Sequence, residues 1–119
     1  MSSSALTNLG NLHIVAGRIT YTAGIPALIC NDESTAIIDT GTGIAQVTFG
    51  DPFLAAPAVV ANYRKLSETG TTIPTVVVAV ASPTSMIFIF KIDAAGSNST
   101  ADPADGDGCN FIAIGMRFK

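Results

Sequence analysis

The sequence predicts an all-β protein, an antiparallel β-sandwich of the jelly-roll type with about eight strands. Runs rich in Val, Ile, Thr and Phe alternate with short groups of Gly, Pro, Asn, Asp and Ser, which is the pattern of strands separated by turns. No window repeats apolar residues with the spacing of an amphipathic helix. The length of 119 residues suits a single domain. We place that domain at residues 12–119, behind an N-terminal arm formed by residues 1–11.

The order of the expected strands follows from these runs. We expect strands at residues 12–21, 26–30, 35–39, 43–49, 57–65, 73–81, 85–92 and 109–118. Asn31-Asp32 suits a tight hairpin, and so does Thr40–Gly43, where glycine accepts a positive φ. Ser82–Ser85 forms a short turn, and residues 94–108 form a long loop. The polar, glycine-rich composition of that loop does not predict a further strand.

Two prolines mark a corner between the sheets. Pro52 and Pro57 lack the N–H that a β-ladder requires, so they bracket a crossing from one sheet to the other. Phe49 and Phe53 then fall on the same side and fill the bend. The segment is therefore expected to be structural.

Charge and composition exclude several classes of function. Only 13% of the residues are charged, about half the usual share of roughly 25%. The net charge is −3 and the six basic residues are scattered, so we expect no nucleic-acid partner. The apolar runs fall far short of the roughly 20 residues of a membrane span, and the start of the chain does not resemble a secretory signal. This low share of charged residues indicates that part of the protein's surface is covered by other copies of the chain or by a partner.

The two cysteines, Cys30 and Cys109, allow one disulfide at most. Because the sequence shows no export signal, we expect two thiols in strands, while the bridged form stays open.

Three strands are apolar on both faces, which a two-layer sandwich with a solvated exterior does not need. The strands are those at residues 73–81, 85–92 and 109–118. Either a long loop or another subunit covers the outer face, and we favour a subunit interface. The residues expected to line it are Ile87, Ile89, Phe111, Ala113 and Gly115, where the small side chains let neighbouring chains approach closely.

The sequence carries no catalytic constellation. His13 is the only histidine and lies in an expected strand. Asp32 and Glu33 lie in a turn, where carboxylates are solvated. Gly41-Thr42-Gly43 lacks the lysine and helix of a phosphate loop, and no Cys or His cluster has zinc-ligand spacing. We expect neither an enzyme nor a cofactor.

Two weaker binding sites remain open. Asp102, Asp105 and Asp107 place three carboxylates in one glycine-containing loop, the oxygen-rich composition that calcium prefers, although the glutamate of an EF-hand is missing. Tyr63 and Arg64 form the best polar and aromatic group for a glycan. The simpler interpretation is a solvated acidic loop in the first case and a loop anchor in the second.

Residues 43–60 contain Val-Thr-Phe followed by Pro-Phe, a spacer of small residues, a second proline and a further strand, and residues 110–115 read Asn-Phe-Ile-Ala-Ile-Gly. These two segments resemble the sequences of phage tail-fibre heads. Tail-fibre heads are trimeric β-sandwiches similar to H-type lectin and C1q-like domains. The resemblance covers roughly residues 43–118 and implies the sandwich fold and a homotrimer, with receptor binding as a further implication. Residues 85–88 depart from it, because they are more apolar than an exposed fibre tip.

These observations lead to one functional hypothesis and one alternative. The chain is expected to be a complete small protein, a phage capsid decoration (cement) protein that bridges major capsid protein subunits as a homotrimer. It would be assembled in the host cytoplasm and lie on the capsid surface of the virion, with Leu6, Leu9 and Leu12 anchoring the arm. The alternative is a lectin-like tail-fibre head that recognises host surface glycans through Tyr63 and Arg64.

Overall fold

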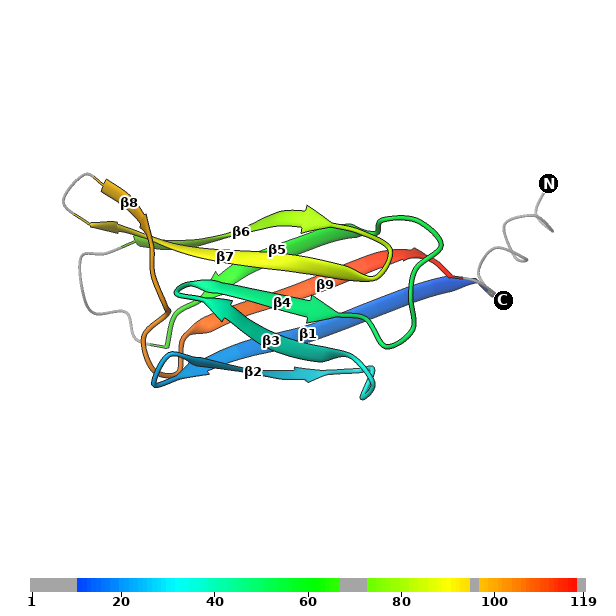
Figure 1. The fold of residues 1–119 in the computed structure, drawn as a ribbon, viewed down its shortest axis with the longest axis horizontal. Helices are drawn as coiled ribbons and strands as arrows, with labels where there is room; N and C mark the ends of the chain where they lie inside the picture. Colours follow the sequence, from blue (N-terminus) through cyan, green and yellow to red (C-terminus); the bar gives the residue numbers. More distant parts are fainter. Residues whose placement is uncertain (1–10, 67–72, 95–96, 118–119) are drawn as a thin grey trace.

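Two antiparallel sheets lie face to face as the layers of a β-sandwich (Figure 1). The computed structural model describes residues 11–66, 73–94 and 97–117. Within these ranges it contains nine strands and no helix. The strands are β1 (Leu12–Thr22), β2 (Ile25–Cys30), β3 (Ala36–Gly41), β4 (Ile44–Thr48), β5 (Ala58–Arg64), β6 (Ile73–Ala81), β7 (Ser85–Ala94), β8 (Ser97–Thr100) and β9 (Gly108–Met116).

The strand order interleaves early and late parts of the chain. The first sheet runs β2-β1-β9-β5, and the second runs β3-β4-β7-β6. The short strand β8 pairs with the end of β7, beyond the part of β7 that pairs with β4. Because β1 pairs with β9 from Leu12↔Met116 to Thr20↔Gly108, the beginning and end of the domain lie side by side.

The predicted all-β class is confirmed, and the expected strands match β1 to β7 and β9 within a few residues. Two local expectations were wrong. Residues 97–100, expected in a loop, form β8 on the edge offered by β7. Asn31-Asp32 is not a hairpin, because β2 pairs with β1 in one sheet and β3 with β4 in the other. This turn carries the chain from one layer to the next.

Three of the hairpins between neighbouring strands have turns within the described residues. Ala23 and Gly24 link β1 to β2 with φ angles of 53° and 78°, the two positive values that a tight type I′ turn requires. Gly43 lies in the β3–β4 turn with a φ of 71°, as its place in the sequence predicted. The β6–β7 turn is closed by a hydrogen bond from the Ser82 N–H to the Ser85 carbonyl oxygen at 2.9 Å.

The core is aromatic and draws on both sheets. Tyr21 and Phe90 meet edge to face across the layers, with ring centroids 5.2 Å apart. The predicted corner is confirmed: the rings of Phe49 and Phe53 are both buried and lie 4.9 Å apart at the crossing from β4 to β5. Aromatic pairs of this geometry add about 0.5–1.5 kcal/mol beyond the burial of their area, so this corner stabilises the connection between the sheets.

The expected assignment of faces on the last strand was wrong. Phe111 and Ala113 are 2% and 0% exposed and belong to the core, and a Cβ on Gly115 would lie 2.8 Å from the Phe53 ring. The residues of β9 that face outward are instead Ile112 and Ile114, which are 46% and 43% exposed. The reason is packing, because the Phe111 ring fills the space opposite Phe88, with 5.3 Å between centroids. These three inward-facing residues therefore do not line a contact between subunits.

On β7, Ile87 and Ile89 do point away from the core. They alternate with the buried side chains of Met86, Phe88 and Phe90, and they are half-buried themselves. Ile89 lies opposite Ile44 of β4 and Val77 of β6, so an apolar row crosses the outer face of the second sheet.

Candidate functional site

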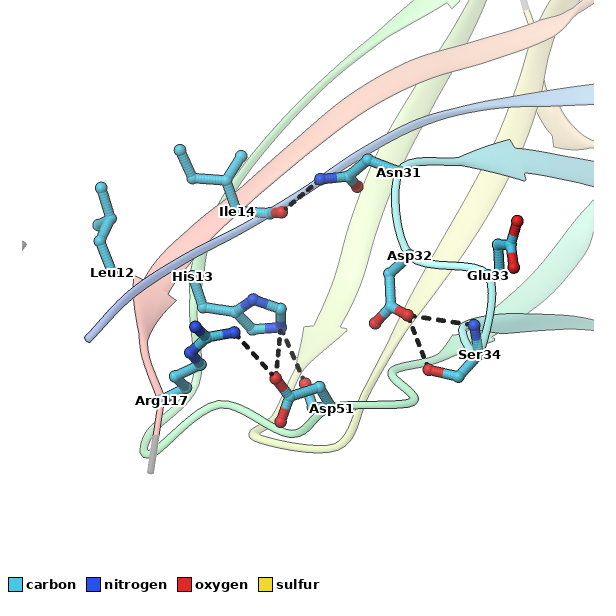
Figure 2. A pocket seen from close by; sticks show the side chains of 9 residues that line it. All are labelled: Leu12, His13, Ile14, Asn31, Asp32, Glu33, Ser34, Asp51 and Arg117. Atoms are coloured by element: carbon cyan, nitrogen blue, oxygen red, sulfur yellow. Dashed lines mark hydrogen bonds and ion pairs between the residues drawn. The ribbon is translucent and has the colours of Figure 1, made fainter. Parts of the chain in front are cut away.

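An open cleft lies at the end of the sandwich where β1 begins (Figure 2). It has a volume of 710 Å³ and is bordered by the start of β1, the turn between β2 and β3, and the loop after β4. The side chains that line it are Leu12, His13, Ile14, Asn31, Asp32, Glu33, Ser34, Asp51 and Arg117. Three carboxylates share this space with one guanidinium and one imidazole, so the cleft is acidic when the histidine is neutral.

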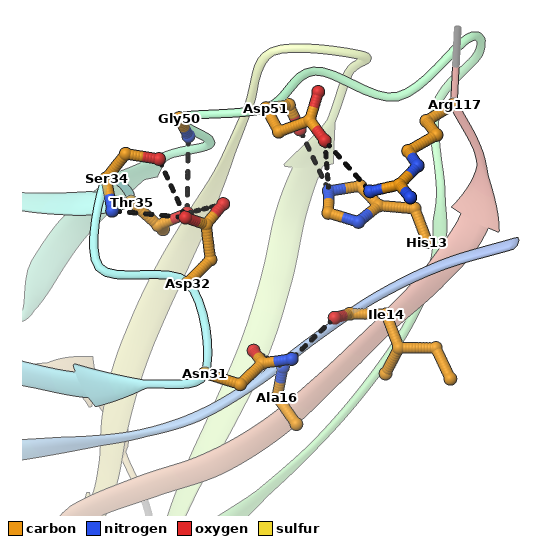
Figure 3. A network of polar contacts seen from close by, with 10 residues as sticks. All are labelled: His13, Ile14, Ala16, Asn31, Asp32, Ser34, Thr35, Gly50, Asp51 and Arg117. Atoms are coloured by element: carbon orange, nitrogen blue, oxygen red, sulfur yellow. Dashed lines mark hydrogen bonds and ion pairs between the residues drawn. The ribbon is translucent and has the colours of Figure 1, made fainter. Parts of the chain in front are cut away.

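His13 joins β1 to the loop that follows β4 (Figure 3). Its Nε2 lies 2.9 Å from the backbone carbonyl oxygen of Asp51, which can only accept, so this nitrogen carries the proton. The ring is 7% exposed and its centroid is 4.6 Å from that of Phe53. Burial and both contacts give His13 a structural role.

Asp51 also pairs with Arg117 just after β9. The Arg117 Nη1 donates to the Asp51 Oδ2 at 3.3 Å, and the same carboxylate oxygen is 4.0 Å from the His13 Nε2. Both side chains of the Asp51–Arg117 pair are more than a third exposed, so solvent weakens their attraction. The pair positions the loop and places one positive charge at the rim of the cleft.

Asp32 organises the turn on the opposite side of the cleft. Its carboxylate accepts hydrogen bonds from the Ser34 hydroxyl at 2.7 Å, the Ser34 N–H at 3.1 Å and the Thr35 hydroxyl at 3.1 Å. The hydrogen bond from the Ser34 side chain is the main cause that holds the pKa of Asp32 below its usual value. Asp32 is therefore ionised at neutral pH and keeps the turn rigid.

Asn31 extends the ladder between β1 and β2 by one step. Its N–H donates to the Ala16 carbonyl oxygen at 3.2 Å, and its side-chain oxygen accepts from the Ala16 N–H at 2.9 Å. Its side-chain nitrogen donates to the Ile14 carbonyl oxygen at 2.8 Å. A side chain thus satisfies part of the β1 edge where β2 no longer accompanies it.

The histidine of the cleft is not paired with a nucleophilic side chain among the described residues. Within residues 11–66, 73–94 and 97–117, His13 makes no hydrogen bond to a serine, threonine or cysteine side chain. In the same ranges no three His, Cys, Asp or Glu side chains lie together in a way that could hold a metal ion.

The three aspartates considered for calcium binding accept hydrogen bonds from different parts of the chain. Asp102 accepts from the Gly43 N–H at 2.6 Å, and Asp105 accepts from the Ala23 N–H at 2.8 Å. Asp107 accepts from the Tyr63 hydroxyl at 3.1 Å. The three carboxylates point to different donors, and within the described residues they are not grouped in a way that could hold a metal ion.

Tyr63 and Arg64, considered for a glycan, are likewise engaged. Besides the bond from Tyr63 to Asp107, the Arg64 Nη2 donates to the Thr20 hydroxyl at 3.1 Å and to the Gly106 carbonyl oxygen at 2.9 Å. Both side chains are half-buried. These contacts fasten the acidic loop to β5 and β1, which fits the simpler interpretation of a loop anchor.

The remaining predicted residues are the leucines of the docking arm and the two cysteines. Leu12, expected in the docking arm, begins β1 and is 38% exposed, whereas Leu6 and Leu9 lie outside the described residues. Cys30 and Cys109 are both free thiols. Burial raises the pKa of the Cys109 thiol to about 12, so this cysteine is unreactive at neutral pH.

Sequence reasoning named His13, Asp32 and Glu33 but did not predict that they share a cleft with Asp51 and Arg117. Asp51 lay between two expected strands and Arg117 in the last one, and neither was given a role, although the two side chains meet across 66 positions of sequence. His13 and Asp51 lie 38 positions apart in the sequence, and their spacing matches no known motif. Only the pairing of β1 with β9 and the crossing after β4 bring these groups together.

Comparison of the chain with known protein families, curated proteins and solved structures found no match. The resemblance to phage tail-fibre heads over residues 43–118 therefore has no independent support. Among the described residues, no helix has the length and hydrophobicity needed to cross a membrane.

Proposed function

We propose that this chain is a structural protein of a virion, a capsid decoration protein that binds to the shell as a homotrimer. In this role it bridges subunits of the major capsid protein on the outer surface of a capsid assembled in the host cytoplasm. The proposal needs surfaces that associate with other proteins rather than a site that transforms a substrate.

The observation that carries the proposal is the exposed apolar face of the first sheet. Val60, Ile112 and Ala16 lie directly opposite one another on β5, β9 and β1. The next row consists of Ala58, Ile114 and Ile14 on the same strands. Opposed residues of neighbouring strands share a face, so the two rows form one continuous surface.

The apolar side chains on this surface have large exposed fractions. Val60 is 71% exposed, and Ile14, Ile112 and Ile114 are each more than 40% exposed. Covering a half-exposed side chain of this size contributes on the order of 1 kcal/mol. Four such side chains in one patch favour association, because contiguous apolar surface of this kind marks protein interfaces.

We assign the contact between trimer subunits to this face, in place of the inward-facing residues of β9. The apolar row of Ile44, Ile89 and Val77 on the second sheet would then contact the shell, with Ile87 beside it. Leu6 and Leu9 would add anchoring contacts from the arm. The low share of charged residues, 13%, supports a protein that has both faces covered.

The order of strand pairing supports a sandwich of the jelly-roll type. Strand β1 pairs with β9, and inside that pair along the chain β4 pairs with β7 in the other sheet. Nested antiparallel pairs of this kind are expected when a long hairpin wraps into two layers. Together with the resemblance of residues 43–118 to trimeric tail-fibre heads, this supports a homotrimer.

The decisive experiment counts copies of this chain in purified virus particles by quantitative mass spectrometry against the major shell protein. A decoration protein is expected in a number comparable to the shell subunit. A small fraction of that number would instead indicate a fibre or tail component. Absence from particles would contradict both viral roles.

The alternative of a lectin-like head has weaker support. Tyr63 and Arg64 are the residues that it requires, and both are half-buried and bonded to other parts of the chain. No aromatic face is therefore presented beside free polar groups at this point. Loss of glycan-array binding in Tyr63→Ala would be the result that revives this function.

A further inference from the structure

Strand β1 extends beyond the strand that accompanies it. Its pairing with β2 begins at Gly17↔Cys30, whereas its pairing with β9 begins five residues earlier, at Leu12↔Met116. Asn31 bonds to both backbone groups of Ala16, so on the side of β2 the segment from Leu12 to Val15 is a sheet edge. Figure 2 shows this edge bordering the cleft, with the Asn31 side chain against it.

The orientation of the edge groups follows from the hydrogen bonds of Asn31. Because Asn31 bonds to the Ala16 N–H and carbonyl and to the Ile14 carbonyl, even-numbered residues of β1 direct their backbone groups toward the cleft. The Ile14 N–H and both backbone groups of Leu12 point the same way. No partner is present for these three groups within the described residues.

The charges beside this edge are predominantly negative. Asp32, Glu33 and Asp51 line the cleft, and Arg117 neutralises only Asp51. Glu33 is exposed and accepts no hydrogen bond from any of the described residues. A cationic side chain that enters between the edge and the turn can therefore pair with the Glu33 carboxylate.

We infer that this edge and cleft bind an extended segment of another protein that carries a lysine or arginine side chain. The segment would add a short strand beside Leu12–Ile14, in line with β2, and take up the free backbone groups. Side chains alternate along a strand. Those on one face would then pack beside the exposed Leu12 and Ile14, and the basic side chain between them would enter the cleft toward Glu33.

A small ligand is a poorer fit to the same features. Unpaired backbone groups in a row are complementary to another backbone, and sheet edges of this kind are recognised by strand addition. The site borders the apolar sheet face and shares Ile14 with it, but the free backbone groups and Glu33 are not part of that face, so the inference does not rest on the proposed function. It can therefore fail or succeed independently of the role in a virion.

The test uses the whole chain, labelled with ¹⁵N, and a capped five-residue peptide of sequence Thr-Val-Lys-Val-Thr. We expect saturable amide shift changes at Leu12, Ile14 and Glu33 at millimolar peptide, with slowed hydrogen exchange of the Ile14 N–H. A peptide with glutamate in place of lysine should bind at least about tenfold more weakly, because it brings like charges together. A peptide N-methylated on the residues that face the edge should lose binding, because it cannot complete the ladder.

Two variants separate the cleft from general charge effects. Glu33→Gln should weaken the lysine peptide about two- to fivefold, the range of one exposed ion pair. Asp39→Asn makes the same change on β3, away from the cleft, and should leave binding unchanged. Absence of binding at millimolar peptide, equal binding of the lysine and glutamate peptides, or shift changes confined to other strands would overturn the inference.

Discussion

The hydroxyl of Tyr63 donates a hydrogen bond of 3.1 Å to the carboxylate of Asp107, across 44 residues of sequence. Asp107 is 6% exposed and also accepts from the Leu66 N–H at 2.8 Å. This buried carboxylate therefore fastens the end of β5 to the segment that leads into β9. These two hydrogen bonds fix the acidic loop that contains Asp107 to the β-sandwich.

Removal of this hydroxyl should destabilise the protein. Tyr63→Phe keeps the ring packed against Phe90, at 6.2 Å between centroids, but leaves the buried carboxylate short of a donor. The expected loss is about 1–3 kcal/mol of unfolding free energy, the cost of an unsatisfied buried group. Urea unfolding followed by circular dichroism measures it. An unchanged midpoint would show that water replaces the hydroxyl at no cost.

The other tyrosine should respond in the opposite direction. The hydroxyl of Tyr21 is buried and has no hydrogen-bond partner among the described residues. Tyr21→Phe removes this unsatisfied group while it keeps the edge-to-face contact with Phe90. The same urea experiment should show equal or higher stability, by up to about 1–2 kcal/mol. A loss as large as that of Tyr63→Phe would mean that the Tyr21 hydroxyl has a partner.

Stability should decline in alkaline solution. Burial raises the pKa of the Cys109 thiol from 9.0 to about 12, and burial followed by the nearby Asp107 raises the pKa of Tyr63 above its ordinary 10.0. A raised pKa means that the unfolded chain loses its proton first. The stabilisation is thus complete below pH 9 and is lost as the pH rises toward the folded values.

The measurement is the unfolding free energy of the wild type and of Cys109→Ala between pH 8 and pH 11. The wild type should lose stability above pH 9, and the variant should lose less over the first part of this range. Parallel curves for the two proteins would show that Cys109 does not contribute to the decline.

The β1–β2 turn contains a strained residue that can be relieved. Ala23 has a φ of 53°, a left-handed conformation that costs an L-residue with a side chain roughly 1–2 kcal/mol. Ala23→Gly should raise the thermal midpoint, since glycine adopts this φ freely and the bond from the Ala23 N–H to Asp105 is kept. Ala27→Gly, within strand β2, is the control and should lower the midpoint. Equal shifts in the two variants would argue against strain at the turn.

The proposed subunit contact can be tested by charge. Ile112→Lys places an ammonium group in the middle of the apolar row on β9, so a trimer that uses this face should dissociate into monomers. Size-exclusion chromatography with light scattering gives the mass. Ile38→Lys is the matched control on the outer face of the other sheet, where Ile38 is 53% exposed, and it should remain trimeric. A trimeric Ile112→Lys would place the contact elsewhere.

Gly115 is unsuitable for the same purpose. Any side chain there would meet the Phe53 ring, with the Cβ at 2.8 Å. A substitution such as Gly115→Arg would therefore disturb the fold before it reports on assembly.

Local residue patterns predicted eight of the nine strands among the described residues, because β-branched and aromatic runs between turn residues favour extended structure; β8 was missed, since its polar residues form a strand only beside β7. The sequence also determined the corner at Pro52 and Pro57, where two residues without N–H groups exclude a ladder and Phe49 and Phe53 fill the bend. These features depend on neighbours in the chain, which a single sequence displays in full.

The packing of the two sheets sets which face of β9 turns inward and which distant groups meet. Both faces of β9 are apolar, so alternation could not choose between Phe111 and Ile112. The choice follows from the space opposite Phe88 in the other layer. The cleft likewise depends on β1 pairing with β9 and on the crossing after β4, which bring Asp51 to His13 and Arg117. Such contacts depend on how separate strands pack, and no local pattern of residues encodes them.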